Sequence, residues 1–225
     1  MLISEIFTSI DGESLRAGEV STFIRTQGCP LRCKYCDSKY TWGKDDGVKE
    51  MSVYEIMNHL KEINAPRNIT LTGGEPLVQP DADDLIIRLS MAGYNVCIET
   101  CGAVDFTTRE WFVKNYAGVW VCADYKTFNS GMTAKMLDPS LFALLRNCDV
   151  LKFVVGSKRD LDQANELIKF LRDHCCNCYM YLSPEFGKIT PKTIVEYMLE
   201  NRLDYKVRFQ LQLHKFVWDP NMRGV

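Results

Sequence analysis

The alternation of short apolar runs with helical patterns is the feature that most limits how this chain can fold. Seven runs rich in Val, Ile and aromatic residues have the composition of β-strands, and they begin at Val20, Asn68, Tyr94, Gly118, Asp149, Cys178 and Lys206. Helical patterns separate most of them, as in residues 52–63, where apolar residues recur every three or four positions. The repeat of roughly 25 to 30 residues is the size of a βαβ unit, which predicts a mostly parallel sheet.

About six such units are too few for the eight of a closed (β/α)8 barrel. We therefore predict an α/β fold, an abbreviated or partial (β/α)6-type barrel with a mostly parallel sheet, to which residues 2–10 add a strand. No Pro-, Ser- or Gly-rich linker interrupts the pattern, so residues 1–225 are expected to form a single domain. In such folds the loops after the strands form the active face, and site residues should follow strands.

Composition excludes several classes of protein. Lys and Arg number 27 against 29 Asp and Glu, so the net charge is -2 and no basic excess favours a nucleic-acid partner. The N-terminal segment is acidic and no window approaches the roughly 18 apolar residues of a membrane span. We expect a cytoplasmic protein without a membrane partner. Its ten cysteines are then expected to be thiols or metal ligands, because disulfides rarely persist in a reducing compartment.

Three cysteines follow the first of the seven predicted strands: Cys29, Cys33 and Cys36 are spaced as CxxxCxxC. Three thiolates on one loop can hold three corners of an iron–sulfur cubane and leave the fourth iron open to another ligand. A structural zinc site needs four closed ligands, and the nearest other candidate, His59, lies on a predicted helix. The spacing favours a cluster, while a zinc-stabilised binding module without catalysis stays open.

The CxxxCxxC loop after the first strand resembles that of the radical S-adenosylmethionine (SAM) superfamily, and Tyr35 stands where that family prefers an aromatic residue. The resemblance implies a 4Fe–4S cluster whose open iron binds the amino and carboxylate groups of the methionine moiety of SAM. One electron then cleaves SAM to the 5'-deoxyadenosyl radical. The protein has to position and shield that radical.

Further strand ends match this superfamily. TGGEP resembles the superfamily segment that binds the methionine amino group. CIETCG stands at the end of the next strand, where the superfamily contacts the ribose of SAM. CADYK and YLSPEFG stand at the ends of two more strands. The resemblance implies a role in binding SAM for Gly73, Gly74, Glu75, Glu99, Thr100, Lys126 and Ser183. Paired glycines also mark ordinary turns, and lysine is normally a solvated residue, so structural interpretations of TGGEP and Lys126 stay open.

Three further segments, SIDGES, CDSKYTW and QLHKFVWDPNMRGV, are similar to those of the 7-carboxy-7-deazaguanine synthases, and this similarity spans nearly the whole chain. It implies conversion of 6-carboxy-5,6,7,8-tetrahydropterin to 7-carboxy-7-deazaguanine with release of ammonia, on the path to queuosine. It also implies Mg²⁺, a flavodoxin or ferredoxin-type reductant and a homodimer. A glycyl-radical activating enzyme is the alternative, since it uses the same CxxxCxxC and TGGEP segments on a protein substrate.

This family resemblance assigns the Mg²⁺ ligand to the hydroxyl of Ser38, which fits a hard cation that prefers oxygen. Arg25 is the candidate for the substrate carboxylate because its guanidinium matches a carboxylate geometrically. Glu13, Gln212 and His214 are the candidates for the heterocycle. A turn serine and a structural histidine are the ordinary alternatives for Ser38 and His214, and orientation of the tail is the alternative for Gln212.

Two departures from the family pattern affect these assignments. Residues 11–14 read Asp-Gly-Glu-Ser where many members have QGEG, so a substrate contact through Asp11 is in doubt. Ser38 stands where many members have threonine, and either residue offers a hydroxyl. Outside the motifs, Cys175, Cys176 and Cys178 are expected to end a helix before the next strand rather than to hold a second cluster.

Overall fold

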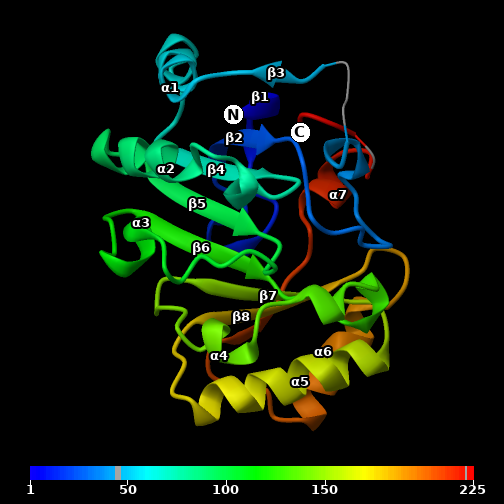
Figure 1. Ribbon diagram of the computed structural model, residues 1–225. Helices are drawn as coiled ribbons and strands as arrows, with labels where there is room; N and C mark the ends of the chain where they lie inside the picture. The colour runs from blue at the N-terminus through cyan, green and yellow to red at the C-terminus, as the bar shows by residue number, and fades with distance from the viewer. Residues whose placement is uncertain (44–46, 221) are drawn as a thin grey trace.

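The computed structural model describes residues 1–43, 47–220 and 222–225. Within them, nine strands form one sheet in the order β3-β1-β2-β4-β5-β6-β7-β8-β9 (Figure 1). Their bounds are β1 Leu2–Ile10, β2 Val20–Thr26, β3 Lys49–Glu50, β4 Asn68–Gly73, β5 Asn95–Thr100, β6 Val119–Asp124, β7 Val150–Val155, β8 Tyr179–Pro184 and β9 Val207–Phe209. Neighbours from β2 to β9 are parallel, whereas β1 is antiparallel to β2 and β3.

The sheet confirms the predicted fold. It is mostly parallel, it is not closed in the described residues because β3 and β9 stand at opposite ends of the order, and β1 is the added strand. Strand β3 was not predicted because two exposed residues carry no alternation that a sequence pattern can reveal.

The helices are α1 Val53–Glu62, α2 Ala82–Met91, α3 Glu110–Val113, α4 Pro139–Phe142, α5 Lys158–Asp173, α6 Pro191–Glu200 and α7 His214–Val217. The run PSLFALLRN, residues 139–147, has apolar residues at helical spacing, which predicts a longer helix than α4, and that prediction is wrong. The backbone N–H of Arg146 donates to the buried carboxylate of Asp149 at 2.7 Å, which turns the chain toward β7 instead of extending α4. None of the described helices is long and apolar enough to cross a bilayer.

The two faces of the sheet differ in chemistry. Alternate residues of β5 and β7, such as Ile98 and Phe153, pack with the helices in one large hydrophobic core. The intervening residues, such as Glu99 and Lys152, belong to the inner face and line a cavity there. Because side chains alternate along a strand, each buried parallel strand supplies both the core and the inner face.

Asp11, whose contact with a substrate the sequence leaves in doubt, forms an ion pair on the inner face of the sheet. Asp11 Oδ2 lies 3.0 Å from Nε of Arg16, and Arg16 donates to the carbonyl oxygens of Asn95 and Ile69 at 3.0 and 3.1 Å. Burial raises the pKa of Asp11 to about 6, against the effect of the Arg16 guanidinium. Asp11 does not line the cavity, so its role in this structure is to bind Arg16 beneath the sheet's inner face.

The segment after β9 connects the two sides of the open sheet. Gln210 accepts from the backbone N–H of Ser14 at 2.6 Å and donates to its carbonyl oxygen at 2.9 Å. The N–H of Leu213 donates to the carbonyl oxygen of Gly12 at 2.9 Å. These bonds hold the C-terminal tail against residues 12–14, which brings Glu13 and the tail to one cavity.

Ser14 sits in a conformation that favours glycine, with φ at 70°, and its hydroxyl is buried without a hydrogen-bond partner among the described residues. We expect Ser14→Gly to raise the free energy of unfolding by about 1 kcal/mol, because the left-handed conformation costs a residue with a Cβ about 1–2 kcal/mol. Urea unfolding measures this. Ser14→Ala removes the hydroxyl and keeps the Cβ, so an equal gain in that variant would contradict the backbone explanation.

Candidate active site

A cavity of about 340 Å³ lies on the inner face, toward the carboxyl ends of the parallel strands. The structure brings most of the sequence-predicted residues together around it: Glu13, Arg25, Cys29, Cys33, Tyr35, Cys36, Ser38, Gly73, Gly74, Glu99, Lys126, Gln212 and His214. They come from β2, β4 and β5 themselves, from the loops after β2, β4 and β6, and from residues 12–14 and the C-terminal tail. The expectation that site residues gather at the carboxyl ends of the strands is thus met for most of the set.

Three predicted residues do not line this cavity. Glu75 is fully buried, and its carboxylate accepts from the hydroxyl of Thr100 at 3.0 Å and from the N–H of Cys101 at 2.6 Å. In this structure Glu75 and Thr100 therefore link the loop after β4 to the end of β5. The hydroxyl of Ser183 is buried in β8 without a partner among the described residues. Roles for these three in cofactor binding stay predictions.

The glycine pair at the end of β4 lies against the backbone of residues 26–28, which leaves no room for a Cβ. A Cβ on Gly73 would lie 2.2 Å from the carbonyl oxygen of Thr26, and one on Gly74 would lie 2.2 Å from that of Gly28. Gly73 also has φ at 136°, which side chains rarely allow. These glycines let the end of β4 pack against the start of the cysteine loop, while their backbone remains at the cavity wall.

The three cysteines of the loop pack in one cluster with Leu31, Cys101 and Met132. A hydrogen bond with the Cys101 thiol lowers the pKa of Cys29 to about 7, while burial raises the pKa of Cys33 to about 11. No three His, Cys, Asp or Glu side chains of the described residues converge on a single metal ion. Each thiolate of a cubane binds a different iron, so such convergence is not needed, and three thiols around one cavity fit the 4Fe–4S cluster.

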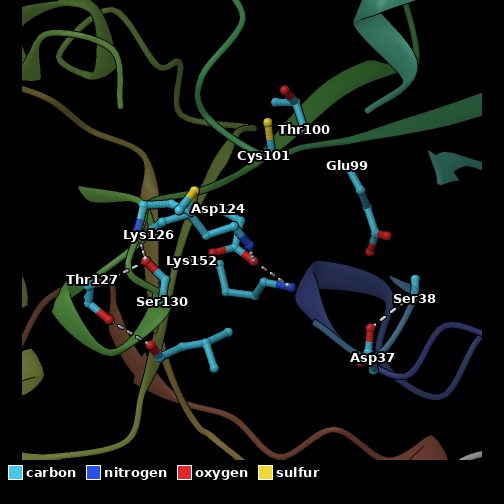
Figure 2. A network of polar contacts seen from close by, with 12 residues as sticks. Asp37, Ser38, Glu99, Thr100, Cys101, Asp124, Lys126, Thr127, Ser130 and Lys152 are labelled. Carbon is cyan, nitrogen blue, oxygen red and sulfur yellow. Dashed lines mark hydrogen bonds and ion pairs between the residues drawn. The ribbon is translucent and has the colours of Figure 1, made fainter. Parts of the chain in front are cut away.

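Two lysines whose side chains are only 12% exposed share a carboxylate on the inner face (Figure 2). Asp124 Oδ2 lies 2.8 Å from Nζ of Lys126 and 3.6 Å from Nζ of Lys152, and Lys152 also donates to Glu13 Oε2 at 2.8 Å. Burial alone would lower the pKa of Lys152, but the carboxylates of Glu13 and Asp124 raise it well above its usual range. Both lysines therefore stay charged.

The sequence reasoning did not assign a role to Lys152, because it looked for site residues after strands and Lys152 lies within β7. The available signal was a single lysine inside the apolar run DVLKFVV, at a position that alternation assigns to the inner face.

Glu13, Gln212 and His214 form the wall opposite the sheet. Gln212 Nε2 donates to Glu13 Oε1 at 2.5 Å, so Lys152 and Gln212 bind different oxygens of the same carboxylate. Burial would raise the pKa of Glu13, but Lys152 and Gln212 lower it below its ordinary value. Burial lowers the pKa of His214 and keeps the imidazole neutral near pH 7. A Cβ on residue 12 would lie 2.2 Å from Nδ1 of His214, so the position of the imidazole requires glycine at residue 12.

Arg25 and Ser38 also line the cavity, and Arg25 contacts β1. Nε of Arg25 lies 2.8 Å from Glu5 Oε1, which also accepts from the hydroxyl of Tyr40 at 2.7 Å. The hydroxyl of Ser38 donates to Asp37 Oδ1 at 3.0 Å. The Lys215 ammonium, 3.3 Å from Asp37, lowers the pKa of this half-exposed carboxyl to about 2. In the view of Figure 2, the carboxylate of Glu99 points toward the segment with Asp37 and Ser38.

Comparison with known proteins supports the assignment that this geometry suggests. Residues 23–118 match the Radical SAM superfamily. The 7-carboxy-7-deazaguanine synthase of Clostridium acetobutylicum is 41% identical and is aligned over 99% of this chain and 98% of its own length. The enzyme of the same name from Methanospirillum hungatei is 36% identical, over 98% and 86%.

Solved structures show the same fold. QueE from Escherichia coli superposes with a TM-score of 0.73 at 23% identity, covering 93% of both chains. SuiB from Streptococcus suis has a TM-score of 0.61 at 14% identity, covering 84% of this chain and 48% of its own. Taken with the full-length relatives, the chain belongs to the 7-carboxy-7-deazaguanine synthase family of radical SAM enzymes.

Proposed function

We propose that this chain converts 6-carboxy-5,6,7,8-tetrahydropterin to 7-carboxy-7-deazaguanine with release of ammonia, in the biosynthesis of queuosine. The observation that carries the proposal is one cavity lined by the cysteine loop, by Arg25 and by the group of Glu13, Gln212 and His214. The same cavity offers both the cysteine loop and polar groups suited to a carboxylate and a bicyclic heterocycle. A glycyl-radical activating enzyme would need to admit a protein segment instead, and a zinc module would not need this polar cavity.

Membership of the family implies a 4Fe–4S cluster and SAM. When bound, they supply the 5'-deoxyadenosyl radical that takes hydrogen from the substrate. We assign the cluster to Cys29, Cys33 and Cys36, the methionine carboxylate of SAM to the charged Lys126, and its ribose to Glu99. Glu99 already accepts from the hydroxyl of Thr72 at 2.7 Å, which fixes its carboxylate on the inner face.

The substrate's carboxylate is assigned to Arg25, whose remaining guanidinium N–H groups can form a bidentate pair with it. Glu13 is held ionised and accepts from the amino and ring N–H donors of the pterin. The neutral imidazole of His214 offers one donor and one acceptor to the same heterocycle. We assign Mg²⁺ to Ser38, with the substrate carboxylate completing its oxygen ligands.

The proposal extends to the chain as a whole. Residues 1–225 act as a single domain that forms a homodimer, works in the cytoplasm and receives its electron from a flavodoxin or ferredoxin-type protein. In support of a reducing compartment, all ten cysteines are free thiols in the structure. No nucleic acid or membrane takes part.

Anaerobic reconstitution with iron and sulfide, followed by turnover with SAM, dithionite, Mg²⁺ and the pterin, tests the proposed reaction. Mass spectrometry should find the carboxylated deazapurine, and Cys33→Ala should abolish it, because the variant lacks one thiolate of the cluster. Cys148→Ala, at a half-buried thiol outside the cavity, is the matched control and should retain turnover. Absence of the deazapurine from a protein that binds the cluster and cleaves SAM would refute the assignment.

Gly12→Ala tests the position of His214. The added Cβ displaces the imidazole, so we expect KM for the pterin to rise at least about tenfold, since small misplacements of positioning groups are costly in rate and binding. Steady-state kinetics measures KM, and thermal unfolding measures any loss of stability separately. Gly43→Ala is the control because a Cβ there meets no atom of the described residues within 4 Å. An unchanged KM in Gly12→Ala would show that His214 does not contact the substrate.

Lys152→Met tests the charge of Glu13. Without the ammonium, burial dominates and the pKa of Glu13 rises above its ordinary value. In the wild type Glu13 becomes protonated only at a pH below the ordinary pKa of glutamate. In the variant it becomes protonated at higher pH, as the pH falls through the raised pKa. The acidic limb of kcat/KM should therefore move to higher pH, as measured between pH 5 and 8. An acidic limb at the wild-type position would exclude Glu13 as an ionised acceptor.

A further inference from the structure

Two cysteine side chains contact each other in the turn between α5 and β8, outside the candidate active site. Sγ of Cys176 lies 3.6 Å from Sγ of Cys178, close enough for a weak S–H···S hydrogen bond. Both residues precede β8, whereas the cavity lies toward the carboxyl ends of the strands, and in Figure 1 this turn lies on the side of the sheet away from α7. Neither cysteine lines the cavity, so the pair takes no part in the proposed reaction.

The backbone of the turn fixes the positions of the two cysteines. Cys175 follows α5 in the left-handed conformation, with φ at 58°, and the N–H of Cys176 donates to the last turn of α5 at 2.9 Å. This ends the helix before the next strand, as the sequence predicted. Cys178 directly precedes β8, whose first residue, Tyr179, donates its N–H to the carbonyl oxygen of Asp149 at 3.0 Å. The contact between the two sulfurs is therefore a property of the fold rather than of a free loop.

The sulfur of Cys176 is also held from the side of α4. It lies 3.6 Å from the carbonyl oxygen of Phe142 and 3.7 Å from that of Leu145, and its thiol can donate to either. These contacts keep the Cys176 sulfur beside that of Cys178.

The two thiols differ in exposure, as a reactive thiol and a resolving thiol do. Cys176 is half-buried and within reach of a small molecule, whereas Cys178 is fully buried. The ammonium of Lys206 donates to the carbonyl oxygen of Asn177, which places a cation next to Cys176. The contact with the Cys178 thiol lowers the pKa of Cys176 to about 7, although burial acts to raise it. Cys176 therefore carries a large share of thiolate at neutral pH, and the thiolate is the nucleophile.

We propose that Cys176 and Cys178 form a redox-active dithiol that a peroxide closes to a reversible disulfide. The sulfur of Cys176 attacks one peroxide oxygen, the O–O bond breaks and a water molecule leaves, so that Cys176 becomes a sulfenic acid. The sulfur of Cys178 then attacks that of Cys176, an S–S bond forms, the S–O bond breaks and a second water molecule leaves. Overall the two thiols lose two electrons and two protons, and the peroxide is reduced to water.

A disulfide suits this pair better than a second metal site does. No three His, Cys, Asp or Glu side chains in the described part of the chain converge on a metal ion, whereas a disulfide needs only two sulfurs, which bond at about 2.05 Å. Because Cys178 already contacts Cys176, it can resolve the sulfenic acid before a second oxidant molecule arrives. Disulfides that form in a reducing compartment are typically transient and respond to oxidants.

Peptide mapping reads this pair separately from the cysteines of the cavity. Trypsin releases residues 173–188 as one peptide, which contains Cys175, Cys176 and Cys178 and no other cysteine. The reconstituted holoprotein is treated anaerobically with a small excess of hydrogen peroxide at pH 7, and its free thiols are then alkylated. Mass spectrometry of the peptide and its fragments shows which cysteines carry the label.

In the wild type we expect this peptide to lose two hydrogen atoms and to carry a label only at Cys175, and dithiothreitol should restore all three labels. The bond should form at least about tenfold faster than peroxide oxidises Cys148, another half-buried thiol, in the tryptic peptide of residues 147–152. The reason is that burial raises the pKa of Cys148, whereas that of Cys176 is lowered. Cys175→Ser, the matched control in the same turn, should form the bond at the wild-type rate. Cys178→Ser should stop at a sulfenic acid that dimedone traps.

Several results would overturn the proposed dithiol: three labelled cysteines after peroxide treatment, a bond that includes Cys175, or oxidation of Cys176 no faster than that of Cys148. All of these are read on the wild type, so they decide the proposal even where a serine variant fails to fold. The proposal is independent of the proposed function, because absence of the deazapurine from the turnover assay leaves this peptide and its labels unchanged.

Discussion

The contact between Lys152 and Glu13 is the interaction on which the arrangement of the cavity depends. A buried ammonium in the middle of β7 would be costly without a partner, and Glu13 supplies one from a segment that precedes it by 139 positions. Because Gln212 binds the other oxygen of Glu13, the same carboxylate also positions the C-terminal tail. One buried charge therefore links the central sheet, the segment after β1 and the segment after β9. Each of these contributes a wall of the cavity.

The sequence predicted the sheet well because its signal is local. Each parallel strand is buried on both faces, so runs such as GVWVCA and DVLKFVV stand out from the polar helices that follow them. The elements that were missed or mispredicted are the ones in which a distant contact decides the structure. Asp149, which binds the N–H of Arg146, ends α4 early, and no periodicity in residues 139–147 reveals that contact. Two-residue β3 exists through its pairing with Leu2 and Ile3 of β1.

The candidate site was predictable where motif residues lie on loops, and less so where residues hydrogen-bond other protein groups instead of lining the cavity. The cysteines, Arg25 and the tail pair of Gln212 and His214 all line the cavity, as the family resemblance suggested. Glu75 shows the limit of that approach. A carboxylate in TGGEP was expected to face a ligand, but here it accepts hydrogen bonds from Thr100 and Cys101 and is fully buried. The adjacent glycines likewise allow backbone to approach backbone, which a motif cannot distinguish from an approach to a ligand.

The division of labour between the faces of the sheet explains how a fold of this kind separates stability from chemistry. The outer face is apolar and packs against the helices, so its residues are constrained by shape and volume. The inner face holds charged groups that are stable only as a connected set: Lys126 and Lys152 share Asp124, and Lys152 also binds Glu13. Removing one member leaves a charge without its partner, so the protonation of the remaining groups depends on the whole set. A closed barrel would leave less room for such a set and for a ligand beside it. The open sheet, closed on one side by the tail, provides that room and keeps the polar groups away from bulk water.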